Sequence, residues 1–232
     1  MPARQLGQYR GPLTPDQIAE GMNAARRNAK RLARDAELLL AEDRAPSALA
    51  LALLSIEESG KISILRGLPV AGPEGLKESW REYRSHTRKN VMGGLLDEVA
   101  NGARKLDDFL SLFSKDAEHP QVLNQLKQVA LYTDCLGDAH WSVPEEVVEP
   151  PLASQLVQLA LVLAGREVDT TPTEIELWIK HLGPVWKQDP AWMRQALQNW
   201  YDDMQRHGLA PEGPNAMTRF IKEGVGTDQA DE

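Results

Sequence analysis

Apolar residues recur along the first part of the chain at the spacing of an amphipathic helix. Between residues 18 and 39 the steps from one to the next alternate between four and three, which places them on one face: Ile18, Met22, Ala25, Ala29, Leu32, Ala36 and Leu39. The preceding Thr14-Pro15-Asp16-Gln17 has the form of a helix start, with an N-cap threonine, a proline at the first helical position and a glutamine at the third. Because this seam is rich in alanine, we expect a partner helix to approach it closely.

A second helix is predicted from Pro46, since four large apolar residues continue the helical spacing: Leu49, Leu53, Ile56 and Leu65. Gly67 and Pro69 mark its end. Further helical patterns run from residue 75 past His86, over 95–113 and over 122–135. We find no strand pattern.

Three prolines within Trp141–Pro151 indicate a linker. Helical patterns continue beyond it, and we expect the tryptophans from Trp178 onward to form the core of a second, smaller unit. The sequence therefore predicts an all-α fold, with a helical bundle over residues 14–145 and a C-terminal helical extension over 152–225.

The amino-acid composition favours helix over sheet and limits the classes of binding partner. Of the 232 residues 42% are hydrophobic but only 6% aromatic, and alanine and leucine outnumber the β-branched residues. The net charge of −8 excludes a global basic field that would attract nucleic acid, although a local basic patch remains compatible with it. The single Cys135 excludes an intramolecular disulfide and a multi-cysteine zinc site. Without an apolar signal region or a membrane-length apolar stretch, we expect a cytoplasmic protein without membrane contact.

A basic stripe follows the first helix, mostly on the side away from the apolar seam: Arg26, Arg27, Lys30, Arg31 and Arg34. Such a stripe contacts phosphates in some proteins and is a solvated helix face in others, and the sequence leaves both readings open.

Two adjacent carboxylates, Glu57 and Glu58, lie in the second predicted helix within ALALALLSIEESGK, Ala48–Lys61. Glu57 and Lys61 are four residues apart and can pair on one face. Because a stretch of alanine and leucine precedes them, we expect at least one carboxylate to be partly buried and paired with Lys61, with an arginine of the third helix or with His86.

The third predicted helix carries WREYRSHTRK, Trp80–Lys89, which is dense in groups that bind phosphates or move protons. On an ideal helix Arg81 and His86 lie about 140° apart, whereas Glu82, His86 and Lys89 share a face. Carboxylates, a histidine and arginines on neighbouring helices would form a polar site inside the bundle.

Four stretches of the chain resemble the AbiV family. They are NAxxLxxDAxLLL (Asn28–Leu40), LALLSIEESGK (Leu51–Lys61), RSHTRK (Arg84–Lys89) and LYTD followed by W and P (Leu131–Pro144), and the resemblance covers residues from about 14 to 165. AbiV proteins are associated with bacterial abortive infection against phage and are grouped with the HEPN superfamily of often dimeric α-helical bundles.

The resemblance implies a site and a chemistry. Many HEPN proteins are metal-independent ribonucleases with an Arg-x4-6-His motif, which corresponds here to Arg81 and His86. The arginine would hold the phosphate and the histidine would act on the 2′-hydroxyl. No metal or cofactor is expected. The partners would be RNA and a second copy of the chain, with the seam Met22–Ala29 or the helix of Arg81 near the two-fold axis. The expected site residues are catalytic Arg81, His86, Glu57 and Glu58, and substrate-binding Lys61, Arg84 and Lys89.

A second hypothesis assigns no catalysis. In it the EExGK element, residues 57–61, is a buried ion-pair network that fixes the bundle, and a surface binds a phage or host protein. The acidic net charge favours this hypothesis.

Overall fold

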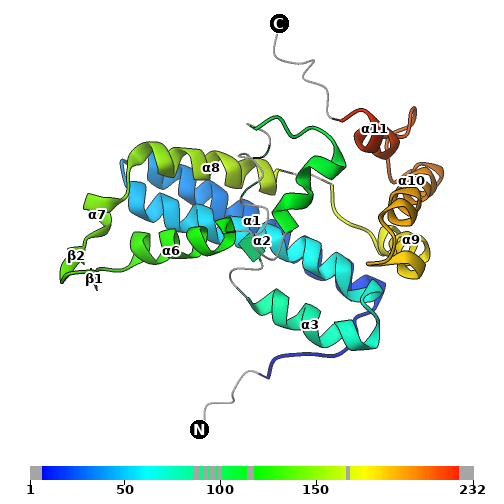
Figure 1. The fold of residues 1–232 in the computed structure, drawn as a ribbon, viewed down its shortest axis with the longest axis horizontal. Coiled ribbons are helices and arrows are strands. Elements are labelled where there is room, and N and C mark those ends of the chain that lie inside the picture. Colours follow the sequence, from blue (N-terminus) through cyan, green and yellow to red (C-terminus); the bar gives the residue numbers. More distant parts are fainter. Residues whose placement is uncertain are drawn as a thin grey trace, which may run out of the picture.

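The computed structural model describes residues 7–85, 89–90, 94, 98, 101–113, 118–165 and 168–224. Apart from one small hairpin, the elements in this part of the chain are helices, so the all-α prediction is confirmed (Figure 1). The α-helices are α1 (Pro15–Ala41), α2 (Ala45–Gly67), α3 (Gly72–Arg84), α6 (His119–Leu131), α7 (Pro144–Val147), α8 (Pro150–Ala164), α9 (Pro172–Leu182), α10 (Pro190–Arg206) and α11 (Ala216–Lys222). Short 3-10 helices are η1 (Leu68–Val70), η3 (Leu106–Phe113) and η4 (Gly183–Val185). None of the described helices is long and apolar enough to cross a bilayer.

Helix α1 begins as the sequence predicts. The Thr14 side chain accepts a hydrogen bond from the backbone N–H of Gln17, and the Gln17 side chain accepts one from the backbone N–H of Thr14. This reciprocal pair satisfies two backbone donors that a helix start leaves open. The predicted apolar seam is buried along almost its whole length and packs mainly on α2; only Leu39, at its end, is partly exposed.

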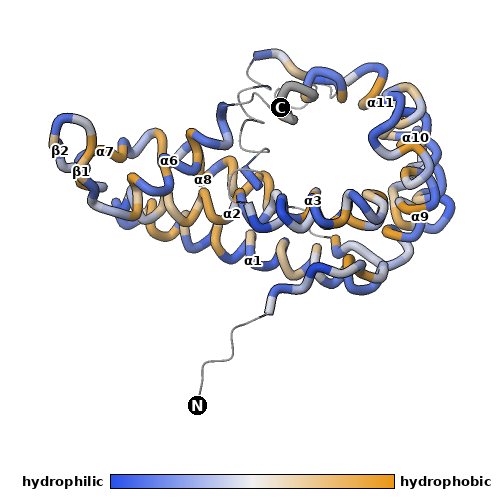
Figure 2. Tube along the Cα trace, turned by 60° about the horizontal axis from the view of Figure 1, so that its bottom comes forward, coloured by the Kyte–Doolittle hydropathy of each residue, from blue (hydrophilic) through white to orange (hydrophobic). Residues whose placement is uncertain are grey.

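The main core lies where α1, α2, α6 and α8 meet (Figure 1). Helix α2 is buried on several sides because α1, α6 and α8 all pack against it. Hydropathy follows this packing: hydrophobic positions run along α2 and α8, whereas α1 alternates between hydrophobic and hydrophilic (Figure 2). Leu53 has no exposed surface, and its truncation to alanine would destabilise the protein by roughly 2–5 kcal/mol.

Helix α8 belongs to this same core. Its buried residues Ala153, Val157 and Ala160 pack with Ala48 and Leu53 of α2. The packing therefore changes after Ala164, rather than at the prolines near residue 151 where the sequence suggests a division.

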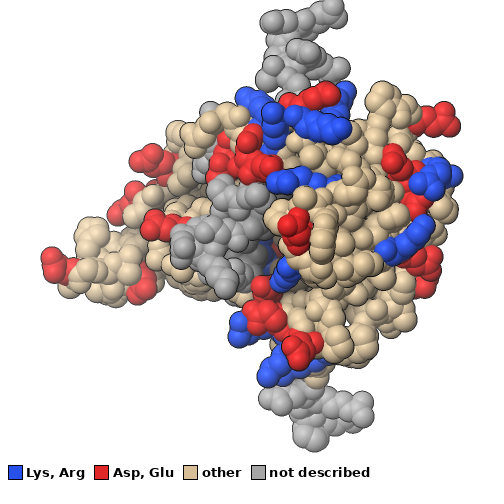
Figure 3. All heavy atoms as spheres, turned by 45° about the vertical axis from the view of Figure 1, so that its right-hand side comes forward, with Lys and Arg blue, Asp and Glu red and all other residues tan. Residues whose placement is uncertain are grey.

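The C-terminal part forms its own apolar cluster around two tryptophans. Trp178 of α9 and Trp200 of α10 meet edge to face with ring centroids 5.3 Å apart, and Leu182 and Met204 pack beside them. The core role predicted for these two tryptophans is confirmed, whereas Trp192 is largely exposed. Ile175 of α9 packs against α1 and α2, which docks this unit on the bundle. Basic and acidic side chains are interspersed on the face seen in Figure 3.

A two-stranded antiparallel hairpin corrects one expectation. Strands β1 (Asp134–Leu136) and β2 (His140–Ser142) pair where the sequence suggested a helix to residue 135 and an irregular linker from 141. Gly137 and Ala139, both at positive φ, make the turn. Strands of three residues are too short to show alternation, which is why the pattern misses them.

Candidate functional site

Glu57 lies inside the bundle and holds two buried lysines. Its side chain is 3% exposed. Lys127 of α6 donates a hydrogen bond to Oε1, and the Nζ of Lys89 lies 3.3 Å from Oε2. Both ammonium groups are themselves almost fully buried. Since a buried charge is tolerated only when it is paired, this cluster links α2, α6 and the residue at position 89.

Gly60 explains how Lys89 comes so close to α2. A Cβ on Gly60 would lie 2.0 Å from the backbone oxygen of Lys89, a separation that no side chain can adopt. Gly60 follows Glu57 by three residues, so both lie on the same side of α2. The glycine admits the backbone of Lys89 and the glutamate binds its ammonium group. Two residues of the EExGK element therefore fix one residue of the RSHTRK element.

Glu58 and Lys61 form a separate pair. Glu58 Oε1 lies 2.5 Å from Lys61 Nζ, and both side chains are partly exposed. The Lys61 ammonium also lies 5.5 Å from the centre of the Tyr83 ring. The expected pairing of Glu57 with Lys61 is therefore wrong, because Glu57 faces the core while Lys61 lies on the side of Glu58. The expectation that one of the two carboxylates is buried and paired is confirmed for Glu57 in its burial, but the partners described for it, Lys89 and Lys127, are not among those expected.

Arg81 of α3 points into solvent, whereas Arg84 of the same helix binds other parts of the chain. The Arg81 side chain is 77% exposed and pairs with Glu78 at 2.5 Å. Arg84 donates to the backbone oxygens of Trp80 and Tyr9, and its guanidinium lies 5.1 Å from the centre of the Trp80 ring. These contacts fasten the segment before α1 onto α3.

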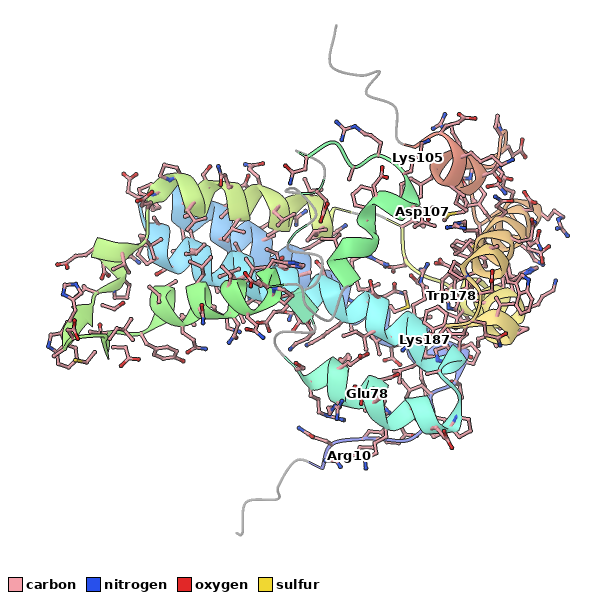
Figure 4. The ribbon with its side chains drawn as sticks, in the orientation of Figure 1. Arg10, Glu78, Lys105, Asp107, Trp178 and Lys187 are labelled. Carbon is pink, nitrogen blue, oxygen red and sulfur yellow. The ribbon has the colours of Figure 1, made fainter. Side chains whose placement is uncertain are left out.

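A groove of about 830 Å³ runs along this side of α3 and the segment before α1. Four basic and two acidic residues are among the described residues that line it: Arg10, Lys77, Arg81, Arg84, Glu74 and Glu78. Trp80 and Ser85 also line the groove, and Figure 4 shows Arg10 and Glu78 on this side of the molecule. A local excess of positive charge on a chain of net charge −8 favours an anionic ligand here.

The chain continues from this groove directly to His86. Helix α3 ends at Arg84, and Ser85 has an extended backbone with φ −79° and ψ 127°. His86 lies outside the described residues, so its predicted proximity to Arg81 stays a prediction. The single helix face expected to join Glu82, His86 and Lys89 is wrong, because α3 ends before residue 86 and Lys89 is buried beside Glu57. Arg81 and Arg84 line one groove, whereas Glu57 and Lys89 lie together in the core.

The basic stripe of α1 divides into one buried and several exposed residues. Arg26 is buried, bonds to the Asn23 and Thr170 side chains and lies 3.8 Å from Asp169. The stripe that remains, Arg27, Lys30, Arg31 and Arg34, lines a shallow depression with Asp35, which pairs with Arg31 at 3.0 Å.

A second buried carboxylate, Asp203, organises the polar side of α9 and α10. It lies 2.7 Å from Lys180, 2.5 Å from His181 Nε2 and 2.6 Å from Arg206. The hydrogen bond from Lys180, helped by that with His181 and by the charge of Arg206, lowers the pKa of Asp203 from 3.8 to about 2 although burial opposes the shift.

Among the described residues, no three histidine, cysteine, aspartate or glutamate side chains gather in a way that could hold a metal ion.

In comparison with known proteins, the family model HEPN_AbiV, described as AbiV, matches residues 17–164. No curated protein and no solved structure matches the chain. The matched range ends where α8 ends and where the packing changes.

Proposed function

Since the chain belongs to the AbiV family of HEPN proteins, we propose that it is a phage-defence effector that cuts RNA at the groove beside α3 and so stops translation. The observation that carries this proposal is the local excess of basic residues in that groove, from which the chain leads directly into His86. A backbone phosphate is the anion that such a groove would bind in RNA.

Arg81 is the phosphate ligand in this proposal. Its guanidinium is exposed at the groove, and a guanidinium can bind two phosphate oxygens at once. Glu78 pairs with Arg81 and holds its guanidinium on the groove side of α3. RNA would bind this guanidinium either in place of Glu78 or together with it.

His86 is the proton-transfer group. It would take the proton of the 2′-hydroxyl while that oxygen attacks the adjacent phosphorus. The bond from phosphorus to the 5′-oxygen then breaks, and the leaving oxygen takes a proton from solvent. The products are a 2′,3′-cyclic phosphate and a 5′-hydroxyl, with no metal or cofactor in the step.

The remaining expected site residues hold neighbouring parts of the chain in place. Arg84 holds α3 against the N-terminal segment, and Glu57 holds Lys89, three residues after His86. Arg84 and Lys89, which flank His86 in the sequence, are thereby each held in place. Glu58 and Lys61 hold Tyr83 from the α2 side, and Lys89 is too buried to contact RNA itself.

A homodimer belongs to the same proposal, with α3 rather than the α1 seam near the two-fold axis. Met22 and Ala29 have no exposed surface, because the seam packs on α2 and its neighbours within one chain. The seam therefore cannot also form a dimer interface. Helix α3, in contrast, keeps an exposed basic side.

The experiment is cleavage of cellular RNA by the purified chain, with and without extract from phage-infected cells. The parent is expected to shorten RNA, and its binding to RNA is expected to weaken as salt rises. Arg31→Ala removes an exposed arginine of α1 outside the groove and serves as the control for an Arg81→Ala variant, which should lose cleavage whereas Arg31→Ala should still cut. If the parent leaves all RNA intact under both conditions, the ribonuclease proposal is wrong.

The second candidate is a non-catalytic interaction module, and one observation favours it. Around the hairpin, at the end of the molecule opposite α9–α11, four large apolar side chains are exposed: Leu131, Tyr132, Leu136 and Trp141 (Figure 1). Trp141 is 62% exposed, and clustered exposure of this kind marks protein-binding surfaces. If Trp141→Ser abolishes phage defence while His86→Ala leaves it intact, this second function holds.

A further inference from the structure

A second pocket lies where the C-terminal unit docks on the bundle, away from the groove beside α3. Its volume is about 430 Å³, and its walls come from four helices and from the turn after η4. Arg26 belongs to α1, Ser59, Ser63 and Arg66 to α2, Leu163 to α8 and Trp178 to α9, while Trp186 follows η4. Figure 4 shows Trp178 on the side of α9 that faces α2.

Two guanidinium groups line the pocket, and each also lies near a carboxylate, Glu174 for Arg66 and Asp169 for Arg26. Two arginines and no carboxylate are among its described lining residues. Arg66 pairs with Glu174 at 2.5 Å and lies 5.3 Å and 5.6 Å from the ring centres of Trp178 and Trp200, while Thr170 and Asn23 orient Arg26. A guanidinium has five N–H donors, so each can keep these partners and still bind an acceptor oxygen.

Two buried polar groups on the pocket wall have no hydrogen-bond partner in the described structure. They are the Ser59 hydroxyl and the indole N–H of Trp178, both more than nine-tenths buried. A buried donor without an acceptor destabilises a fold by roughly 1–3 kcal/mol, so such groups call for a specific reason. The Ser59 hydroxyl can turn toward the cavity by rotation about χ1, and a bound molecule with acceptor oxygens would then satisfy it.

Aromatic rings form one side of the same pocket. Trp178 and Trp186 meet edge to face with centroids 6.1 Å apart, and both line the cavity. Trp186 is only partly buried, so its ring offers a planar ring a stacking partner, while the arginines and Ser59 offer oxygens a polar end. A volume of this size is within the range of small-molecule sites.

We propose that this pocket binds a small organic anion that carries a planar ring, of the size and chemistry of a nucleoside monophosphate. The ring lies against Trp186, next to Trp178, and the anionic group binds Arg66, Arg26 and the Ser59 hydroxyl. Because the family match ends at residue 164, both tryptophans come from the part of the chain beyond it. The site is thus built by the docking of the C-terminal unit and goes beyond the proposed action on RNA.

The test is calorimetric titration of the full chain with AMP, GMP, CMP, UMP and inorganic phosphate, together with tryptophan fluorescence. At least one of the nucleotides is expected to bind with Kd below about 1 mM and to quench fluorescence, with inorganic phosphate at least about tenfold weaker. Ser59→Ala removes a hydroxyl that the fold leaves unbonded, so it should keep the melting temperature and weaken binding roughly 3–10-fold. Ser63→Phe fills the pocket from an exposed position on α2 and should abolish binding.

Ser79→Ala is the matched control, since Ser79 bonds to Gly75 on α3 outside this pocket, and it should bind like the parent. The proposal is overturned if none of the four nucleotides binds, if Ser63→Phe binds as well as the parent, or if inorganic phosphate binds as tightly as the nucleotides. Because the readout is binding rather than cleavage, failure here is distinguishable from failure of the ribonuclease proposal.

Discussion

The Nζ of Lys89 lies 3.3 Å from a carboxylate oxygen of Glu57, with both side chains almost fully removed from water. Lys127 binds the other oxygen of the same carboxylate, so one buried anion holds two buried cations. This arrangement fixes position 89 against α2, three residues beyond His86. The EExGK element therefore links the core of the bundle to the segment that contains His86, which we propose as the proton-transfer group.

Replacing Glu57 by glutamine should destabilise the protein strongly. The change leaves the ammonium groups of Lys89 and Lys127 buried without their carboxylate, which costs about 3–5 kcal/mol for a broken buried pair. Urea unfolding followed by circular dichroism measures the loss. Glu58→Gln is the control and should cost about 1 kcal/mol or less, because the Glu58–Lys61 pair is partly exposed. Equal losses for the two variants would show that Glu57 is not the anchor.

Gly60→Ala tests the close approach of the Lys89 backbone. In a helix alanine is more favourable than glycine by about 1 kcal/mol, so the propensity alone predicts stabilisation. At position 60 we expect the opposite, a loss of roughly 1–3 kcal/mol, because the new Cβ would collide with the Lys89 carbonyl. Gly21→Ala in α1 is the matched control: its Cβ would meet only Leu65 at an ordinary 3.4 Å, and the melting temperature should stay or rise. A rise for both variants would contradict the packing at Gly60.

The Asp203 cluster predicts acid sensitivity of the C-terminal unit. The folded pKa of Asp203 is about 2, below its ordinary 3.8, so the ionised form stabilises the fold. That contribution is fully present above pH 4 and is lost as the pH falls toward 2. Melting temperatures of the parent and of Asp203→Asn should therefore differ most at pH 5–6 and converge near pH 2. A difference that stays constant over this range would exclude Asp203 as the titrating group.

Helix positions were predictable where the information is local. The seam of α1 and its Thr14–Gln17 cap follow from periodicity and from residue types at fixed offsets, and the structure confirms both. The burial of Glu57 was indicated in the same way by the alanines and leucines before it.

Partners across the fold were not predictable. Lys127 is 70 residues from Glu57 and Lys89 belongs to a different part of the chain, so no spacing rule joins them. The signal that was available is Gly60, a glycine inside a helix beside a buried carboxylate, which indicates close backbone approach. The pocket lined by Arg66 and Trp178 was not predictable for the same reason, because its residues come both from the helical bundle and from the C-terminal unit that packs on it. The hairpin strands were too short for any pattern to show.

Arg81→Lys separates phosphate binding from folding. Lysine keeps the charge but loses the two-pronged contact, so RNA cleavage should fall about tenfold or more while the melting temperature stays within about 2 °C, since Arg81 is exposed and pairs only with Glu78 among the contacts described. Cleavage rates and thermal melts on the same preparations measure both. A parallel loss of stability and activity would make Arg81 a structural residue.

The central claim, that this AbiV-family protein acts on RNA through the segment after α3, is tested most directly by His86→Ala. Cleavage of cellular RNA by the purified variant is compared with the parent at matched folding, confirmed by melting temperature. We predict that the variant folds like the parent and leaves RNA intact, because it lacks the group that takes the proton of the 2′-hydroxyl. A His86→Ala protein that folds normally and cuts RNA at the parental rate would contradict the account.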